Sequence, residues 1–97
     1  MRARVVIVRI QPGKADEAAN LYRESVVPAA QQQQGFEGAL LLVDPDTGKG
    51  LSVTMWESEA AMERSEDSGY FKEQLAKFGD LFAEPPRAEH YEVRVRA

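Results

Sequence analysis

Two segments with the alternation of β-strands are apolar on both of their faces, and this restricts the folds open to the chain. The first alternates its large side chains between the faces, with Val5 and Ile7 on one and Val6, Val8 and Ile10 on the other. The second contains an unbroken apolar run, Leu40 to Val43. Helices can cover one face of such a sheet, and a large apolar patch left exposed marks an interaction surface. The sequence therefore predicts a sheet covered by helices on one face and by a second copy of the chain on the other.

The apolar periodicities and the turn signals predict the element order βαββαβ. The expected strands span residues 4–10, 36–43, 51–57 and 87–96, and the expected helical segments span 14–34, 58–75 and 77–82. Pro28 lacks an amide hydrogen and should break the first helix near Val27, and Gly35 should end it. Right-handed crossovers and the central hairpin favour a ferredoxin-like α+β fold, in which helices cover one face of a four-stranded antiparallel sheet. No linker or repeat divides the chain, so residues 1–97 are expected to form one domain.

Composition and charge exclude several classes of function. A net charge of −4 gives no nucleic-acid footprint, and no apolar segment is long enough to span a membrane. The chain has no cysteine, so disulfides and thiolate chemistry are excluded, and a cytoplasmic location is expected. The arginines near the two ends are expected to guard solvated strand edges: Arg2, Arg4, Arg9, Arg94 and Arg96.

Signatures of metal sites, cofactor sites and nucleophiles are also missing from the sequence. His90 is the only histidine, and it is expected on the polar face of the last strand, at the surface or at the seam of a dimer. One histidine without cysteine does not make a dedicated zinc or iron site. Ser25 and Ser65 lack the neighbouring base that a nucleophile requires, and no phosphate loop or dinucleotide fingerprint is present. We therefore expect no metal and no bound cofactor.

The candidate site lies where the third strand meets the second helical region. Alternation places Trp56 on the same strand face as Ser52 and Thr54, and Ser58 can cap the helix that follows. Trp56 either walls a pocket or packs at an interface. Tyr22 lies on the inward stripe of the first helix, as a core residue or as a pocket residue that donates a hydrogen bond. A pocket lining rich in aromatic rings, or an ordinary core, accounts for Met62, Tyr70, Phe71, Phe78 and Phe82.

Three short motifs, together with the element order, resemble the antibiotic biosynthesis monooxygenase family of dimeric α+β barrel proteins. They are the helix break Val27-Pro28, the strand entry Gln34-Gly35-Phe36 and the junction Trp56-Glu57-Ser58-Glu59-Ala60-Ala61. The resemblance covers nearly the whole chain, and it implies a homodimer joined through the sheet face and a pocket between sheet and helices. Members of the family include cofactor-independent oxygenases of polycyclic phenols and quinols, heme-degrading enzymes, and many small proteins with no assigned reaction.

The chain departs from two branches of that family. Heme-degrading relatives use an asparagine, a tryptophan and a histidine where this chain has Val8, Ser65 and Leu75, so heme degradation is not expected. Quinol-oxidising relatives often have a histidine where this chain has Tyr70. A phenol can donate a hydrogen bond there, but it is a poorer base near neutral pH.

The activity implied by the resemblance is oxygen insertion into an electron-rich phenol or hydroquinone without flavin or metal. Trp56 and Tyr70 are then the catalytic candidates, with Trp56 holding the planar ring. A donor such as Tyr22, Tyr70 or Arg9 would favour the deprotonated substrate. The substrate-binding candidates are Tyr22, Arg9, Phe71, Phe78 and Met62. A second class of function stays open, namely a noncatalytic dimeric module that binds a small aromatic ligand or assembles with a partner.

Overall fold

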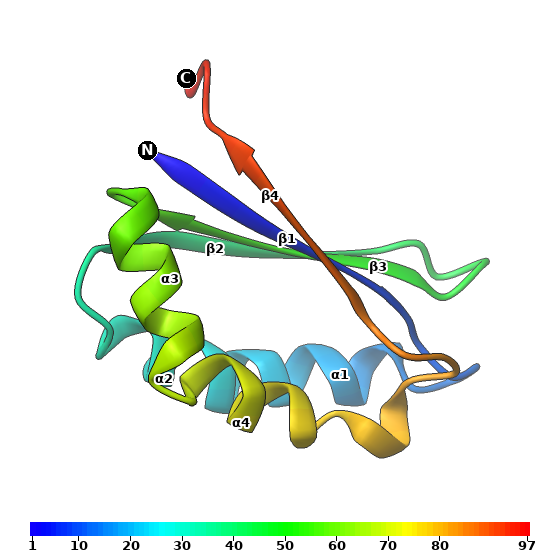
Figure 1. Cartoon of the computed structure of the whole chain (residues 1–97). Coiled ribbons are helices and arrows are strands. Elements are labelled where there is room, and N and C mark those ends of the chain that lie inside the picture. Colours follow the sequence, from blue (N-terminus) through cyan, green and yellow to red (C-terminus); the bar gives the residue numbers. More distant parts are fainter.

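The computed structural model describes all 97 residues, and its strands and helices follow the predicted order (Figure 1). The strands are β1 (Arg2–Arg9), β2 (Phe36–Val43), β3 (Lys49–Trp56) and β4 (Arg87–Glu92). The helical segments are α1 (Ala15–Leu21), the π-helix η1 (Tyr22–Val26), α2 (Val27–Gln31), α3 (Glu59–Asp67), α4 (Tyr70–Ala76) and the 3₁₀ turn η2 (Gly79–Leu81). No helix here combines the length and the hydropathy that a bilayer crossing requires.

The four strands form one antiparallel sheet in the order β2-β3-β1-β4. This is the ferredoxin-like arrangement that the element order predicts, and the helices all lie on one side of the sheet (Figure 1). The first strand is therefore an interior strand, flanked by β3 and β4. Register places Val6 and Leu41 beside Ser52 on the face toward the helices, while Val5 and Leu40 lie beside Val53 on the other face. We call these the covered face and the open face.

The last strand is shorter than predicted. Alternation continues to Arg96, but β4 ends at Glu92 because that residue pairs with Arg2, the first residue of β1. Beyond that point there is no neighbouring strand to pair with, and Val95 is exposed.

The first helix restarts at Val27, as Pro28 predicts, but the break takes a form that the sequence analysis did not foresee. Five residues of π-helix, η1, come before the restart, and Pro28 occupies the first turn of α2. Pro28 has no amide hydrogen to donate, and just before it the amide of Val27 donates five residues back, to the carbonyl oxygen of Tyr22. The helix therefore changes its winding and continues along the sheet.

Gly35 permits the close passage between the end of α2 and the start of β2. Its φ is +86°, a left-handed conformation that favours glycine, and a Cβ there would lie 2.5 Å from the Cβ of Ala61. Its carbonyl accepts the amide hydrogen of Glu57 at 2.8 Å. Ser58 caps α3 as predicted, since its Oγ accepts the amide hydrogen of Ala61 at 3.1 Å. The junction after Trp56 is thereby fixed against the second strand.

The two faces of the sheet differ in what covers them. On the covered face the buried side chains form a larger cluster that includes Val6, Val8 and Tyr22, and a smaller one around Trp56. On the open face Leu40 is 53% and Leu42 is 49% exposed. The prediction that the sheet is apolar on both faces is confirmed.

Candidate functional site

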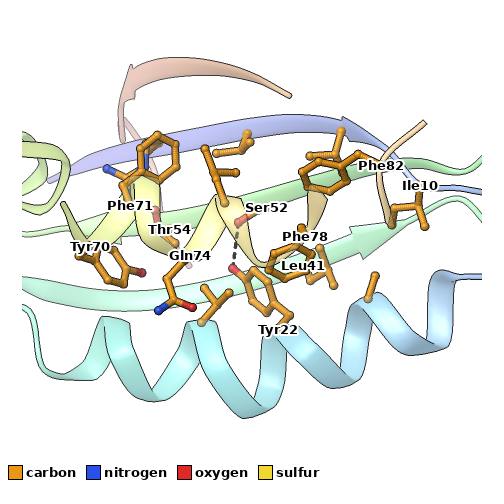
Figure 2. A pocket seen from close by; sticks show the side chains of 16 residues that line it. Ile10, Tyr22, Leu41, Ser52, Thr54, Tyr70, Phe71, Gln74, Phe78 and Phe82 are labelled. Carbon is orange, nitrogen blue, oxygen red and sulfur yellow. Dashed lines mark hydrogen bonds between the residues drawn. The ribbon is translucent and has the colours of Figure 1, made fainter. Parts of the chain in front are cut away.

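A cavity lies between the covered face of the sheet and the helices, and we call it the inner cavity (Figure 2). Its cavity volume is about 50 Å³, and the wider hollow around it, open solvent included, measures about 590 Å³. Sixteen residues line it, and twelve of them are hydrophobic. The aliphatic side chains come from the sheet and from the helices, and the aromatic rings come from η1 and from the segment 70–82, so the interior suits an apolar, planar molecule.

Tyr22 projects from η1 toward the sheet in the middle of this cavity (Figure 2). Its hydroxyl lies 3.0 Å from Ser52 Oγ and 3.4 Å from the carbonyl oxygen of Leu40, to which it donates. Burial raises the pKa of Tyr22, and the hydrogen bond with Ser52 opposes that shift. At neutral pH it is therefore an uncharged phenol with partners on the sheet.

Tyr70 and Gln74 lie at one end of the inner cavity, on the first and second turns of α4 (Figure 2). Burial raises the pKa of Tyr70 to about 12. The phenol therefore holds its proton at neutral pH, so Tyr70 can donate a hydrogen bond but does not serve as a base.

Ser25 closes that end from the neighbouring helix. Its Oγ donates to Gln74 Oε1 at 2.8 Å and accepts from Lys77 Nζ at 2.9 Å. Ser65 likewise accepts a hydrogen bond from a guanidinium, that of Arg4. In both pairs the serine accepts the hydrogen bond, and neither serine has a histidine or carboxylate partner to take its proton, in agreement with the sequence analysis.

Arg4 is buried at this same end, and the expectation that it guards a solvated edge is wrong. Its relative exposure is 1%. The reason is the position of β1 inside the sheet, where two-residue alternation places Arg4 on the covered face together with Val6 and Val8. The terminal arginines Arg9, Arg94 and Arg96 are exposed, as predicted.

Four side chains contact the guanidinium of Arg4. Nη1 donates to Ser65 Oγ at 2.9 Å and to Glu66 Oε2 at 3.2 Å. The guanidinium also makes cation–π contacts. Its Cζ lies over the ring of Phe71, 4.1 Å from the centroid, and over the ring of Trp56, 5.4 Å from the centroid. These contacts come from α3, α4 and β3, so the arginine joins the sheet to the second helical region.

One hydrogen-bond donor of this guanidinium nevertheless has no partner. Nε of Arg4 is buried and has no hydrogen-bond partner. A buried unpaired donor costs about 1–3 kcal/mol, and more when it belongs to a charged group. Burial lowers the pKa of Arg4, and Glu66 opposes that shift. A guanidinium remains a cation in proteins, so the cavity has one permanent positive charge in its lining.

Four predicted site residues meet in the inner cavity, and three lie outside its lining. Tyr22, Tyr70, Phe71 and Phe78 line it. Trp56 is fully buried behind the lining, with Nε1 donating to Thr54 Oγ1 at 3.0 Å and its ring edge-on to Phe36 and Tyr70.

The other two outlying residues are held elsewhere. Met62 packs in the small cluster around Trp56. Arg9 is exposed at the end of β1, where Nη1 donates to the carbonyl oxygen of Thr47 at 2.8 Å and Nε lies 3.6 Å from Glu84. The donor position that the sequence analysis gave to Arg9 is occupied in the cavity by Arg4.

Four polar residues that line the cavity were not predicted as site residues: Arg4, Ser52, Thr54 and Gln74. For three of them a signal was available. Ser52 and Thr54 share a strand face with Trp56, and Arg4 shares one with Val6. A polar residue in the inward phase of an interior strand indicates either a buried network or a site.

His90 lies at the surface, as expected, and it contacts the arginine network from outside. Register places it opposite Arg4, and its Nε2 lies 3.2 Å from Glu66 Oε2. Glu66 is therefore shared between a buried guanidinium and a half-exposed imidazole. No group of three or more histidine, cysteine, aspartate or glutamate side chains lies close enough together to hold a metal ion.

Solved structures with the same fold include two oxygenases of Streptomyces. A monooxygenase from the gene ActVA-Orf6 of Streptomyces coelicolor, solved in complex with nanaomycin D, has a TM-score of 0.81 at 20% identity, covering 99% of this chain and 89% of that one. SnoaB, a cofactor-independent oxygenase from Streptomyces nogalater, has a TM-score of 0.78 at 16% identity, covering 98% and 94%. At these identities the likeness shows a shared fold.

Two curated relatives come from Mycobacterium tuberculosis (strain H37Rv). The uncharacterized protein Rv2557 is 34% identical over 64 residues, which is 66% of this chain and 29% of that protein. The uncharacterized protein Rv2558 is 30% identical over 95 residues, which is 94% of this chain and 38% of that protein. This chain therefore spans less than half the length of either relative.

The family comparison agrees with the fold and with the motifs that the sequence contains. The model of the family described as antibiotic biosynthesis monooxygenase matches residues 1–77, from the first strand through α4. The match includes the helix break at Pro28, the strand entry at Gly35 and the junction after Trp56. The chain belongs to the antibiotic biosynthesis monooxygenase family.

Proposed function

We propose that this protein is a cofactor-independent monooxygenase whose substrate is a small phenol, quinol or polycyclic aromatic molecule. The observation that carries the proposal is the inner cavity, an apolar space with aromatic walls and a few hydroxyl, amide and guanidinium groups. Family membership and the shared fold of the two Streptomyces oxygenases support the same class of reaction.

The chemistry needs little from the protein because the substrate supplies the electrons. In an anthrone-like phenol, deprotonation gives a resonance-stabilised carbanion that reduces oxygen. One oxygen atom becomes the new carbonyl group, and the other leaves as water with the two hydrogens that the ring carbon loses. A protein accelerates such a step by holding the ring, by stabilising the anion and by keeping bulk water away.

The residues of the inner cavity suit those three tasks. Phe71 and Phe78 offer faces against which a planar ring can pack. Tyr22 and Tyr70 are neutral phenols whose pKa values are raised by burial. Tyr70 can donate a hydrogen bond to a developing oxyanion, and Tyr22 can do so by exchanging its hydrogen bond to Leu40. In this proposal Tyr70 contacts the substrate, and Trp56 acts from behind the lining by fixing the position of Tyr70.

Oxygen uptake tests the proposal. The purified protein would be incubated with a panel of hydroquinones and anthrone-like phenols, and oxygen consumption would be compared with the spontaneous rate. We expect saturable uptake that falls about 10- to 100-fold in Tyr70→Phe, the range for loss of one hydrogen bond to a charged group. Trp56→Phe should have a smaller effect, because the indole only supports Tyr70.

The outcomes separate the two classes of function. No uptake above the spontaneous rate with any member of the panel would reject the oxygenase proposal for those substrates. Saturable binding without uptake would favour the noncatalytic aromatic-binding module.

We further propose that two copies of the chain pair through their open faces. Half-exposed Leu40 and Leu42 of β2 pair with Val53 and Leu51 of β3. Those two residues pair in turn with Val5 and Ile7 of β1, which makes a continuous apolar surface on this side of the sheet. A standard interface buries about 800 Å² per partner. If half of that area is apolar, the gross gain is about 10 kcal/mol for each partner before the costs of association. Light scattering at micromolar concentration should give the mass of a dimer, and a monomer mass would reject this part of the proposal.

A further inference from the structure

We propose that Arg4 binds the anionic oxygen of the ligand, so that the inner cavity selects aromatic molecules carrying a phenolate or a carboxylate group. The identification of the ligand as aromatic rests on the proposed function. The assignment of Arg4 as its anion-binding residue rests on the geometry of the arginine itself.

The first observation is the charge of the cavity lining. Among the sixteen lining residues Arg4 is the only one with a charged side chain, and twelve of the others are hydrophobic or uncharged aromatic residues. In a low-dielectric space a single cation interacts strongly with an anion that enters. An uncharged molecule would gain much less from that cation, so the lining discriminates between the two.

The second observation is the unused hydrogen-bonding capacity of the guanidinium. Both hydrogen bonds of Arg4 are made by the same nitrogen, Nη1. Nε is buried without a partner. Phe71 occupies the face of the group, so the donors that remain lie along its edge. An edge with free donors is the part of an arginine that binds a carboxylate or another oxyanion.

The third observation is that Glu66 compensates the charge only in part. Its Oε2 accepts from Arg4 at 3.2 Å and lies equally close to His90 Nε2, and its side chain is 26% exposed. Solvent and the imidazole therefore compete for this carboxylate. Glu66 holds the guanidinium in position from the surface side, and a ligand anion would supply the second partner from the cavity side. By the same reasoning, Glu66 also competes with that ligand.

The test compares two probes of the same shape and different charge, naphthoate and naphthamide. Calorimetric titration under nitrogen measures both affinities at neutral pH without any oxidation. We expect the wild-type protein to bind naphthoate about 10- to 100-fold more tightly than naphthamide, the equivalent of one charge-assisted hydrogen bond.

Three variants then assign the preference to Arg4. Arg4→Met combined with Glu66→Gln replaces both charges, so no carboxylate is left unpaired, and the affinity ratio should fall to about 1. Glu66→Gln alone keeps the guanidinium and removes its competitor, so naphthoate should bind more tightly while naphthamide is unchanged. Arg9→Met is the matched control, an arginine of the same strand outside the cavity, and should leave the ratio unchanged.

Near-UV circular dichroism of Trp56, which lies beside the guanidinium, verifies that each variant is folded. If the double variant is not folded, the naphthoate affinity of Glu66→Gln still tests the assignment of Arg4. Equal affinities in the wild type, an anion preference that survives in the folded double variant, or weaker naphthoate binding in Glu66→Gln would overturn the assignment.

These binding results are independent of turnover. An anion preference that depends on Arg4 without oxygen uptake would reject the oxygenase proposal and keep the assignment. Oxygen uptake without that anion preference would support the oxygenase proposal and reject the assignment of Arg4.

Discussion

The two faces of the sheet are built from the same strands, yet they distribute polarity in opposite ways. The covered face buries the guanidinium of Arg4, and the open face leaves Leu40 and Leu42 about half exposed. Side-chain hydropathy alone would reverse both placements. The covered face accepts the arginine because Ser65, Glu66 and Phe71 contact it. The difference teaches that burial follows the partners available at each face.

The largest expected effect concerns the open face. The double variant Leu40→Lys with Leu42→Lys places ammonium groups in the proposed interface, where desolvating each ion costs several kcal/mol. The dimer should therefore dissociate at least about 100-fold more readily. Sedimentation or light scattering over a concentration series measures this. Gln32→Lys, at an exposed position after α2 on the other side of the sheet, is the control and should leave the mass unchanged.

Replacing a glycine by alanine should cost more stability on the helix side of the sheet than on the open face. Gly35→Ala forces a left-handed residue against Ala61, and the expected loss in free energy of unfolding is about 2–4 kcal/mol. Gly38→Ala lies on the open face, where the new Cβ would meet only the flexible end of Met55, at 3.1 Å, and the side chain of Arg96. Its cost should stay below about 1 kcal/mol. Urea unfolding gives both values, and equal costs would contradict the contrast.

Alkaline pH should lower the free energy of unfolding because the covered face buries phenol groups. The pKa of Tyr70 is raised from 10.0 to about 12, so between these values the unfolded chain releases a proton that the folded chain retains. Stability is therefore full below pH 10 and falls above it, by at most about 1.4 kcal/mol per pH unit. Tyr70→Phe should flatten this slope, leaving a part due to Tyr22, whose pKa is also raised by burial.

Tyr91 provides the comparison for that profile. It lies on the open face, half exposed, and its pKa is raised chiefly by its hydrogen bond to Glu89. Because that bond lies at the surface, Tyr91→Phe should leave most of the alkaline slope in place. An equal flattening by the two variants would show that burial in the inner cavity is not the cause.

The smallest expected effect is that of Arg9→Met. Both side chains of the Arg9–Glu84 pair are largely exposed, and surface ion pairs contribute about 0–1 kcal/mol. The midpoint of urea unfolding should therefore move little. A loss above about 2 kcal/mol would mean that the arginine at the exposed end of β1 is as embedded as the one in its interior.

Most of the fold could be predicted from the sequence because the signals that define it are local. Pro28, Gly35 and the Ser58 cap each fix a boundary through their own backbone chemistry. The end of β4 could not be predicted in this way. Alternation continues through Val93 and Val95, and only the position of the partner strand ends the pairing at Glu92.

The candidate site was predicted in part, and the errors have one cause. Helical spacing placed Tyr22 inward, and their aromatic rings made Tyr70, Phe71 and Phe78 candidates for a pocket lining or for the core; all four line the cavity. Arg4 was assigned to an edge although it has the same phase as Val6, because the order of strands in the sheet depends on tertiary pairing. Trp56 has the inward phase too, but whether an inward ring meets a cavity or a neighbour is set by side chains distant in sequence.

The wide turn of η1 has a consequence for how the first helical region lies along the sheet. Its buried residues Ala18, Tyr22, Val26 and Ala30 follow one another at intervals of four. An α-helix turns by about 100° per residue, so over the three intervals the position of Ala30 would be rotated by about 120° around the helix axis relative to Ala18. The added residue of the π winding takes up part of this drift. Deleting one residue from Tyr22–Val26 should therefore rotate α2 about the helix axis and turn Ala30 away from Trp56.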